Sequence, residues 1–241
     1  MALKVDAIYV QTTPAALAAK QVTSTIPIII PTAIDPIGAG LAASLARPGG
    51  NVTGLAMMSP EISGKALSLL REAIPGLRRV AVLWNAGNPA FTAVWQDAES
   101  TARSEGLALA PKPVRGPQDF ALVFADLASK RPDGLLVLAD ALVGQNLKPV
   151  VEFTVQQHLP AVSTFRAFTD LGGLMSYGPS LAAANRKAAD YVDRVLKGAS
   201  PAQLPFQQPT TFELVINLKT AKALDLALPS LLVTRADEVI E

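Results

Sequence analysis

The segment 79–84 reads Arg79-Val80-Ala81-Val82-Leu83-Trp84, and the segment 135–138 reads Leu135-Leu136-Val137-Leu138. Both runs lack the regular alternation of apolar and polar residues that a half-exposed strand shows. Continuous apolar runs of this length are typical of strands that are covered on both faces, as in parallel sheets with helices on each side. The two runs predict strands at 79–84 and 134–138 and therefore an α/β fold with doubly wound sheets.

Six further segments of strand length alternate with helical stretches, and this rhythm supports the same fold class. The predicted strands are 5–10, 27–30, 52–56, 108–114, 161–163 and 174–177. The predicted helices are 14–23, 62–73, 88–105, 118–130, 144–158 and 179–197. Thr13 is expected to be the N-cap of the first helix, with Pro14 at its first position. The proline-rich segment 198–209 and a further extended segment, 210–216, have the irregularity that a chain crossing between two lobes needs.

The composition argues against several classes of partner and chemistry. The chain of 241 residues carries 21 Lys and Arg against 20 Asp and Glu, and it has no dense basic cluster, so we expect no nucleic-acid binding. It has no cysteine, which excludes disulfides, thiolate metal sites and a cysteine nucleophile. No run of about 18 apolar residues is present, so the sequence predicts no helix that spans a membrane.

The motifs of common enzymes are also missing. His158 is the single histidine, and its place at the end of a helical run fits an ordinary partly exposed residue. No Gly-x-Ser-x-Gly elbow, phosphate-binding loop or dinucleotide loop with three glycines occurs. The sequence therefore predicts no catalytic residues, no metal site and no cofactor.

Polar and aromatic residues follow the predicted strands where a ligand site is expected. Open α/β sheets bind ligands at the carboxyl ends of their strands, and helix N-termini there suit anionic groups. Some of these residues, such as Thr13 and Asn88, have an alternative role as caps or turn residues, and Asp35 before Pro36 is a common turn start. The candidate ligand-binding residues are Thr12, Thr13, Asp35, Pro36, Asn85, Asn88, Asp140, Phe165 and Tyr177.

Several strings of residues resemble one family over essentially the whole chain, in order. The most specific is Leu45-Ala46-Arg47-Pro48-Gly49-Gly50-Asn51-Val52-Thr53-Gly54. Others are Val10-Gln11-Thr12-Thr13-Pro14, Asp35-Pro36-Ile37-Gly38-Ala39-Gly40-Leu41, Ser176-Tyr177-Gly178-Pro179 and Phe212-Glu213-Leu214-Val215-Ile216-Asn217. They resemble the ABC-transporter substrate-binding family that includes the tryptophan- and tyrosine-type binding proteins.

The resemblance implies a type I periplasmic-binding-protein fold with two Rossmann-like lobes and a ligand cleft between them. The N-terminal lobe would comprise residues 1–56 and about 178–206, and the C-terminal lobe residues 57–177 and about 207–241. Relatives carry a signal peptide and a further βαβα unit before the position of Val5, so we expect the first lobe to be incomplete in this chain. The apolar surface that such a gap would expose predicts a homodimer.

The resemblance also implies a function. Members deliver a small solute to an ABC permease from the periplasm or from a lipid anchor outside the inner membrane. The expected ligand is an amino acid, with an aromatic side chain as one candidate. Asp35 would take its ammonium group, Thr12 and Thr13 its carboxylate, and Asn85, Phe165 and Tyr177 would form the walls. A ligand-sensing domain of the same fold without a transport role, and an enzyme on a doubly wound fold, are the alternatives.

Overall fold

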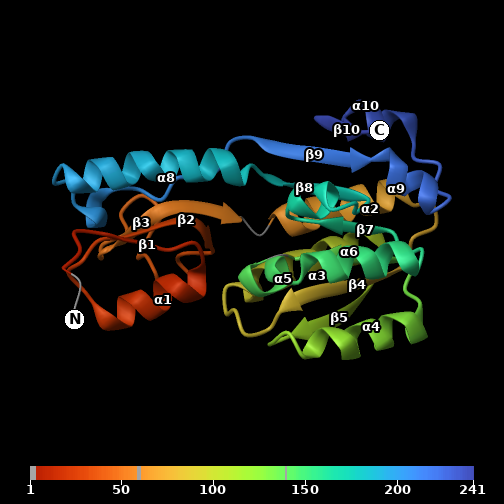
Figure 1. Cartoon of the computed structure of the whole chain (residues 1–241), viewed down its shortest axis with the longest axis horizontal. Helices are drawn as coiled ribbons and strands as arrows, with labels where there is room; N and C mark the ends of the chain where they lie inside the picture. The colour runs from red at the N-terminus through yellow and green to blue at the C-terminus, as the bar shows by residue number, and fades with distance from the viewer. Residues whose placement is uncertain (1–3, 59–60, 139) are drawn as a thin grey trace. The chain divides into compact units, whose positions relative to one another are not determined.

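In the computed structural model, which describes residues 4–58, 61–138 and 140–241, the chain forms two compact units (Figure 1). Unit 1 comprises Met1–Ser59, Asn88–Ala93 and Pro179–Thr211, and unit 2 comprises Pro60–Gly87, Val94–Gly178 and Phe212–Glu241. The segment 207–211, which the sequence placed in the second lobe, thus lies in unit 1. Strands alternate with helices in both units, so the α/β prediction is confirmed.

Unit 1 is built on a three-stranded sheet in the order β1-β2-β3, and both strand pairs are parallel. Its strands are β1 (Ile8–Tyr9), β2 (Ile28–Ile34) and β3 (Val52–Met58), and its helices include α1 (Thr13–Val22), α8 (Leu181–Leu196) and the short 3-10 helix η1 (Pro201–Gln203). The first strand is shorter than the predicted segment 5–10. Helix α8 begins after the N-cap Ser180, two residues later than predicted.

Strand β2 is buried on both faces because helices cover both sides of the sheet. Ile28 and Ile30 pack in one apolar cluster with Ala16 of α1, and Ile29 packs in another with Tyr191 of α8. Figure 1 shows α1 and α8 on opposite sides of this sheet. Burial of alternate residues on opposite faces explains why Ile28, Ile29 and Ile30 follow one another without a polar residue between them.

Unit 2 is built on a seven-stranded sheet in the order β10-β9-β8-β7-β6-β4-β5. Its strands are β4 (Arg79–Asn85), β5 (Ala108–Val114), β6 (Gly134–Val137), β7 (Ala161–Ser163), β8 (Met175–Pro179), β9 (Phe212–Asn217) and β10 (Glu238–Ile240). The pairings of β4 with β5 and β6, of β7 with β6 and β8, and of β10 with β9 are parallel. The predicted parallel arrangement is therefore confirmed for these pairs.

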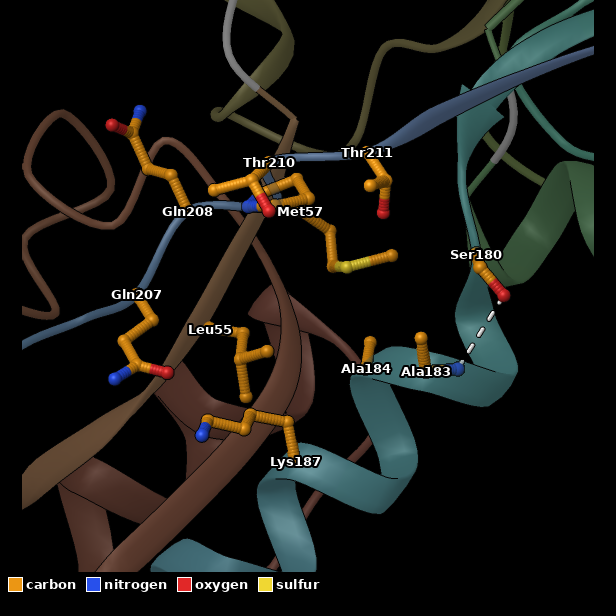
Figure 2. Close-up of a pocket in the computed structure, with 11 residues that line it drawn as sticks. Leu55, Met57, Ser180, Ala183, Ala184, Lys187, Gln207, Gln208, Thr210 and Thr211 are labelled. Carbon is orange, nitrogen blue, oxygen red and sulfur yellow. Dashed lines mark hydrogen bonds between the residues drawn. The ribbon is translucent and has the colours of Figure 1, made fainter.

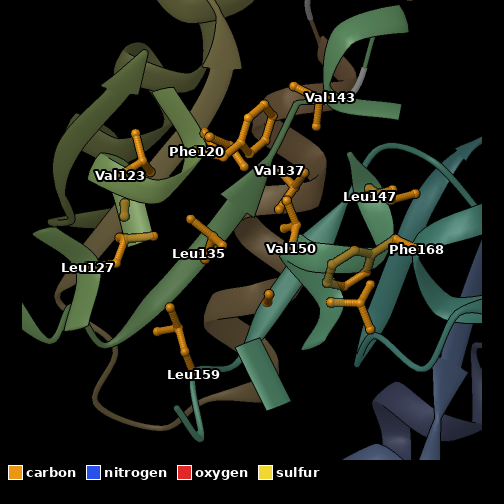
Figure 3. Packing of buried hydrophobic residues seen from close by; sticks show 14 of the residues in the cluster. Phe120, Val123, Leu127, Leu135, Val137, Val143, Leu147, Val150, Leu159 and Phe168 are labelled. Atoms are coloured by element: carbon orange, nitrogen blue, oxygen red, sulfur yellow. The ribbon is translucent and has the colours of Figure 1, made fainter. Parts of the chain in front are cut away.

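Helices cover both faces of the unit 2 sheet. They are α2 (Glu61–Ala73), α3 (Phe91–Glu105), α4 (Asp119–Lys130), α5 (Ala141–Gln145), α6 (Leu147–Gln156), α7 (Ala167–Asp170), α9 (Leu218–Ala223) and α10 (Ser230–Thr234), with the start of α3 in unit 1. Figure 3 shows side chains of α4, α6 and α7 converging on Leu135 and Val137 of β6. Leu136, which points to the opposite face, is also fully buried.

One predicted helix is divided in two. The segment 144–158 was expected to be continuous, but α5 ends at Gln145 and α6 begins at Leu147. Asp140 caps α5, because its Oδ1 accepts hydrogen bonds from Leu142 N at 2.9 Å and Val143 N at 3.2 Å. The side chain of Asn146 donates to Leu142 O at 2.8 Å, which satisfies a carbonyl at the end of the short helix.

Candidate functional site

In unit 1 the structure separates the roles of Thr12 and Thr13. Thr12, not Thr13, is the N-cap of α1, and its Oγ1 accepts a hydrogen bond from Ala15 N at 3.4 Å. Thr13 is 1% exposed, and its Oγ1 accepts a hydrogen bond from Ile34 N at 2.9 Å. The predicted cap at Thr13 is therefore wrong. Thr13 joins the start of α1 to the end of β2, whereas Thr12 lies half-buried at the helix N-terminus.

Asp35 follows β2 directly and forms the turn that the sequence offered as its alternative role. Its backbone has φ 39°, and its Oδ1 accepts a hydrogen bond from Gly38 N at 3.0 Å. Pro36 is buried, and its carbonyl accepts hydrogen bonds from Leu41 N and Ala42 N. Within the described residues no Lys, Arg or His pairs with the half-buried Asp35 carboxylate, so it retains the capacity to bind a cationic group.

In unit 2 the structure brings Asn85 and Asp140 together. Asn85 is the last residue of β4 and Asp140 follows β6, and these two strands are neighbours in the sheet although β5 lies between them in sequence. Asn85 Nδ2 donates a hydrogen bond to Asp140 Oδ2 at 2.7 Å, and Asn85 Oδ1 accepts one from Gly87 N at 2.8 Å. Both residues are buried, at 9% and 6% exposure. Asp140 therefore fixes the orientation of the Asn85 amide as well as the start of α5.

This pair marks the point where the strand order of the unit 2 sheet reverses. From β4 the chain runs first to β5 on one side and then to β6 on the other. The crevice at the carboxyl ends of strands on either side of such a switch point is where open α/β sheets bind their ligands. Asn85 and Asp140 therefore occupy the position where this unit is expected to contact a ligand.

Aromatic side chains lie at the next strands of the same edge. Phe165 follows β7, is half-buried, and packs against the cluster of α4, α6 and β6. The rings of Tyr177 in β8 and Phe212 in β9 are stacked, with centroids 5.9 Å apart and an interplanar angle of 20°. Burial, and secondarily the charge of Asp237, raise the pKa of the Tyr177 phenol above its ordinary value, so this hydroxyl stays protonated at neutral pH.

Phe212, whose ring stacks on the candidate residue Tyr177, is absent from the list of strand ends. It begins β9, so it should lie at the far end of that strand if all strands were parallel. However, Asn217 N at the end of β9 donates to Leu174 O just before β8, which shows that these two strands run antiparallel. The start of β9 therefore meets the end of β8. The segment 210–216 was predicted to be extended, but its direction could not be read from the sequence.

Asn88 has a structural contact of its own. It is 2% exposed, and its Oδ1 accepts a hydrogen bond from Ala90 N at 3.2 Å just before α3 begins at Phe91. This is the turn role that the sequence offered as its alternative. The helix begins three residues later than predicted because the Asn88-Pro89 segment forms this turn.

Metal and membrane features were searched in the part of the chain that the structure describes. No group of three or more His, Asp or Glu side chains is placed there to hold a metal ion. None of the described helices combines the length and apolar character needed to cross a membrane.

Comparison with known proteins places these features in a family. The family described as ABC transporter substrate binding protein matches residues 1–240. This chain belongs to that family. Its members bind small-molecule solutes, work with ABC permeases and act outside the cytoplasm, and they are solute-binding proteins rather than enzymes. Both units conform to the type I periplasmic-binding-protein fold.

Three relatives define the similarity more closely. A tyrosine-binding protein of Clostridioides difficile strain R20291 is 29% identical over 224 residues, which cover 92% of this chain and 64% of the relative. The chain thus spans less than two thirds of that protein's length. A conserved domain protein of Vibrio cholerae has a TM-score of 0.92, and an ABC domain of Streptococcus pneumonia in complex with L-Trp has one of 0.91. Each is 27% identical, and each match covers 98% of this chain and 79% of the solved chain.

Proposed function

We propose that this family member is the solute-binding component of an ABC importer and that its solute is an aromatic amino acid. The observation that carries the proposal is the Tyr177–Phe212 stack at the same sheet edge as the Asn85–Asp140 pair. Flat aromatic rings favour stacked or edge-on contact with another ring, while buried polar groups fix its orientation. The tyrosine-binding relative and the L-Trp complex of another relative support this ligand class.

Each candidate residue has a proposed role that follows from its free polar atoms. Asp35 takes the ammonium group, because its carboxylate has no cationic partner within the described residues. Thr12 takes the carboxylate through its hydroxyl proton, at the positive end of the α1 dipole. Thr13 positions these groups rather than contacting the solute, since Ile34 N already uses its hydroxyl.

In unit 2, too, some candidate residues are proposed to contact the solute and others to position neighbouring groups. Asn85 contacts the solute through its second amide proton, and Asp140 and Asn88 position their own segments. Tyr177, Phe212 and Phe165 surround the aromatic side chain. Pro36 lies beneath the Asp35 turn and shapes it through its carbonyl.

The test is isothermal titration of the purified chain with L-tyrosine, L-tryptophan and L-leucine. Asp35→Asn removes the charge while asparagine tolerates the positive φ and can still accept from Gly38 N. We expect its affinity for the aromatic amino acids to fall about tenfold or more, since a hydrogen bond to a charged group is worth about 1.5–3 kcal/mol. Asp190→Asn, on the exposed face of α8, is the matched control. Unchanged affinity in Asp35→Asn would refute this assignment.

A second variant tests the aromatic ligand class. Tyr177→Leu keeps an apolar side chain but removes the stacked ring and its hydroxyl. We expect it to lose most of the preference for L-tyrosine over L-leucine. Wild-type protein that binds all three amino acids equally, or none of them, would contradict the aromatic solute. A screen by thermal shift would then find the solute, since a ligand at one hundred times its Kd adds about 2.7 kcal/mol of stability.

We further propose that the protein delivers its solute to a permease from the periplasm or a lipid anchor, without chemical turnover. Uptake of labelled tyrosine should be lost in cells from which the gene is deleted and restored by the wild-type gene. Restoration by the Asp35→Asn gene at low tyrosine concentration would contradict this route. Chromatography of the solute after long incubation with the protein should recover it unchanged.

A homodimer through the outer edge of β1 is the last part of the proposal. Within the described residues β1 pairs only with β2, and Val5 and Tyr9 beside this edge are 42% and 43% exposed. An open strand edge with exposed apolar side chains favours pairing with a second chain. Light scattering should give the mass of a dimer for the wild type and of a monomer for Val5→Lys. A wild-type monomer at high concentration would refute it.

A further inference from the structure

Unit 1 contains a cavity of about 520 Å³ that none of the proposed solute residues lines. Figure 2 shows Leu55 and Met57 of β3 on one wall and Ala183 and Ala184 of α8 on the facing wall. Gln207 and Gln208 lie at the left of the view, and Thr210 and Thr211 lie along its top. A hydrogen bond from Gln207 N to Gly54 O at 3.1 Å and one from Ala56 N to Gln207 O at 2.9 Å anchor this segment to β3. The volume lies in the range of small-molecule binding sites.

The walls of this cavity are apolar where strand and helix face each other. Leu55, Met57 and Ala184 are 5%, 4% and 4% exposed, and they belong to the cluster that packs α8 on the sheet. The small side chains of Ala183 and Ala184 leave the space that a larger residue would fill. An alkyl or aryl group of a ligand would fit against these walls.

The rim carries hydrogen-bonding groups that are not used elsewhere in the described chain. The side chains of Gln207, Gln208, Thr210 and Thr211 make no hydrogen bond to any described residue. The cavity has one charged lining residue, Lys187, and no acidic one among the described residues. Lys187 Nζ lies 3.7 Å from Asp190 Oδ2, and both side chains are at least half exposed, so this ion pair is weak. The charge of the rim therefore favours an anion.

We propose that this cavity is an accessory binding site for a small amphipathic carboxylate, with Lys187 as the partner of the carboxylate. The apolar tail lies between β3 and α8, and the amide and hydroxyl groups of the 207–211 segment complete the contacts of the head group. The site is separate from the proposed amino acid site, and the proposal stands whether or not that function is correct.

Methionine methyl NMR tests the proposal with octanoate as the probe. The chain has four methionines, among which Met57 lines the cavity and Met175 is buried in unit 2. With ¹³C-methyl methionine, octanoate should shift the Met57 signal saturably and leave Met175 unmoved. Met57→Leu assigns the signal. Octylamine, with the same tail and a positive charge, should cause no saturable shift of Met57 at the same concentrations.

Two variants and two controls make the test specific. Lys187→Gln, at an exposed position, should weaken octanoate binding about five- to tenfold, and Ala183→Leu should abolish it by filling the cavity. Lys197→Gln, also on the α8 side but outside the cavity, should bind like the wild type. Asp35→Asn should also bind octanoate normally, which separates this site from the proposed solute site. Equal binding by Lys187→Gln and the wild type, equal binding of octylamine, or no saturable Met57 shift would overturn the proposal.

Discussion

Replacing Thr13 by valine should destabilise unit 1 without changing the shape of the side chain. Thr13 is 1% exposed, Ile34 is 7% exposed, and Ile34 N donates to Thr13 Oγ1 at 2.9 Å. Valine leaves this buried N–H without its acceptor, which costs about 1–3 kcal/mol. For a unit of about 100 residues, each kcal/mol lowers the melting temperature by about 4–8 °C, so we expect a loss of about 4–24 °C in the transition of unit 1.

The assay must report on each unit, because a chain of two units need not unfold in one step. Both tryptophans, Trp84 and Trp95, lie in unit 2, so their fluorescence follows that unit, while far-ultraviolet circular dichroism follows both. Hydrogen exchange of the Ile34 amide measures the bond itself and should accelerate in Thr13→Val. Thr13→Ser keeps the hydroxyl and should retain most of the protection.

Two outcomes would refute the reasoning about Thr13. Exchange of the Ile34 amide at the wild-type rate in Thr13→Val would show that the bond does not protect it. A loss of solute affinity in Thr13→Val with unchanged stability would show instead that Thr13 contacts the solute directly. The serine variant separates these outcomes, since it should preserve both properties if the hydroxyl position is what matters.

Three other predictions follow from single features of the structure. Gly54 has φ 149°, and a Cβ there would overlap the carbonyl oxygen of Ile30. Gly54→Ala should therefore destabilise unit 1 by at least the ~1–3 kcal/mol that a strained backbone costs. Thermal unfolding followed by circular dichroism measures this loss. Lys112 lowers the pKa of Asp126 below its ordinary value of 3.8, so Asp126→Asn should be less stable than the wild type at pH 7, and the difference should vanish as the pH falls through the lowered pKa. Burial raises the pKa of all three tyrosines, so the phenolate absorbance of the native protein should have its midpoint above the ordinary value of 10.0. The stability linked to these groups should be lost as the pH rises through the raised values. The tyrosines concerned are Tyr9, Tyr177 and Tyr191. A phenolate titration of the native protein with its midpoint at 10.0 would contradict this prediction about the tyrosines.

The buried strands were predictable because a strand that is covered on both faces needs apolar residues at successive positions. The predicted segment 79–84 differs by one residue from β4, and 134–138 differs by one residue from β6. Strand β1 was predicted too long, at 5–10 against Ile8–Tyr9, because Val5 is exposed beside the sheet rather than paired in it. Hydrophobicity alone does not distinguish those two environments. The break between α5 and α6 was missed for a similar reason, since it depends on the caps that Asp140 and Asn146 provide.

The order of strands limited what the sequence could say about unit 2. Asn85 and Asp140 were both placed at strand ends from the sequence, but nothing in it shows that β6 rather than β5 carries the partner of Asn85. The pair forms because the chain passes from β5 across β4 to β6. In the same way, the stack of Tyr177 on Phe212 depends on the antiparallel direction of β9. Local pattern identifies the residues of such a site, and the topology decides which of them meet.

Thr12 and Thr13 show why the sequence could not separate ligand contacts from structural contacts. Consecutive residues at the start of a helix point about 100° apart, so one hydroxyl can face solvent while its neighbour faces the sheet. Both threonines satisfy the same preference for a hydroxyl near a helix N-terminus, so propensity does not decide between them. The distinction comes from which polar atoms the fold has already used. Ile34 N occupies the Thr13 oxygen, whereas the Asp35 carboxylate keeps an oxygen for which no described residue supplies a cation. A candidate site read from sequence therefore becomes a specific proposal only when the hydrogen bonds of each residue are counted.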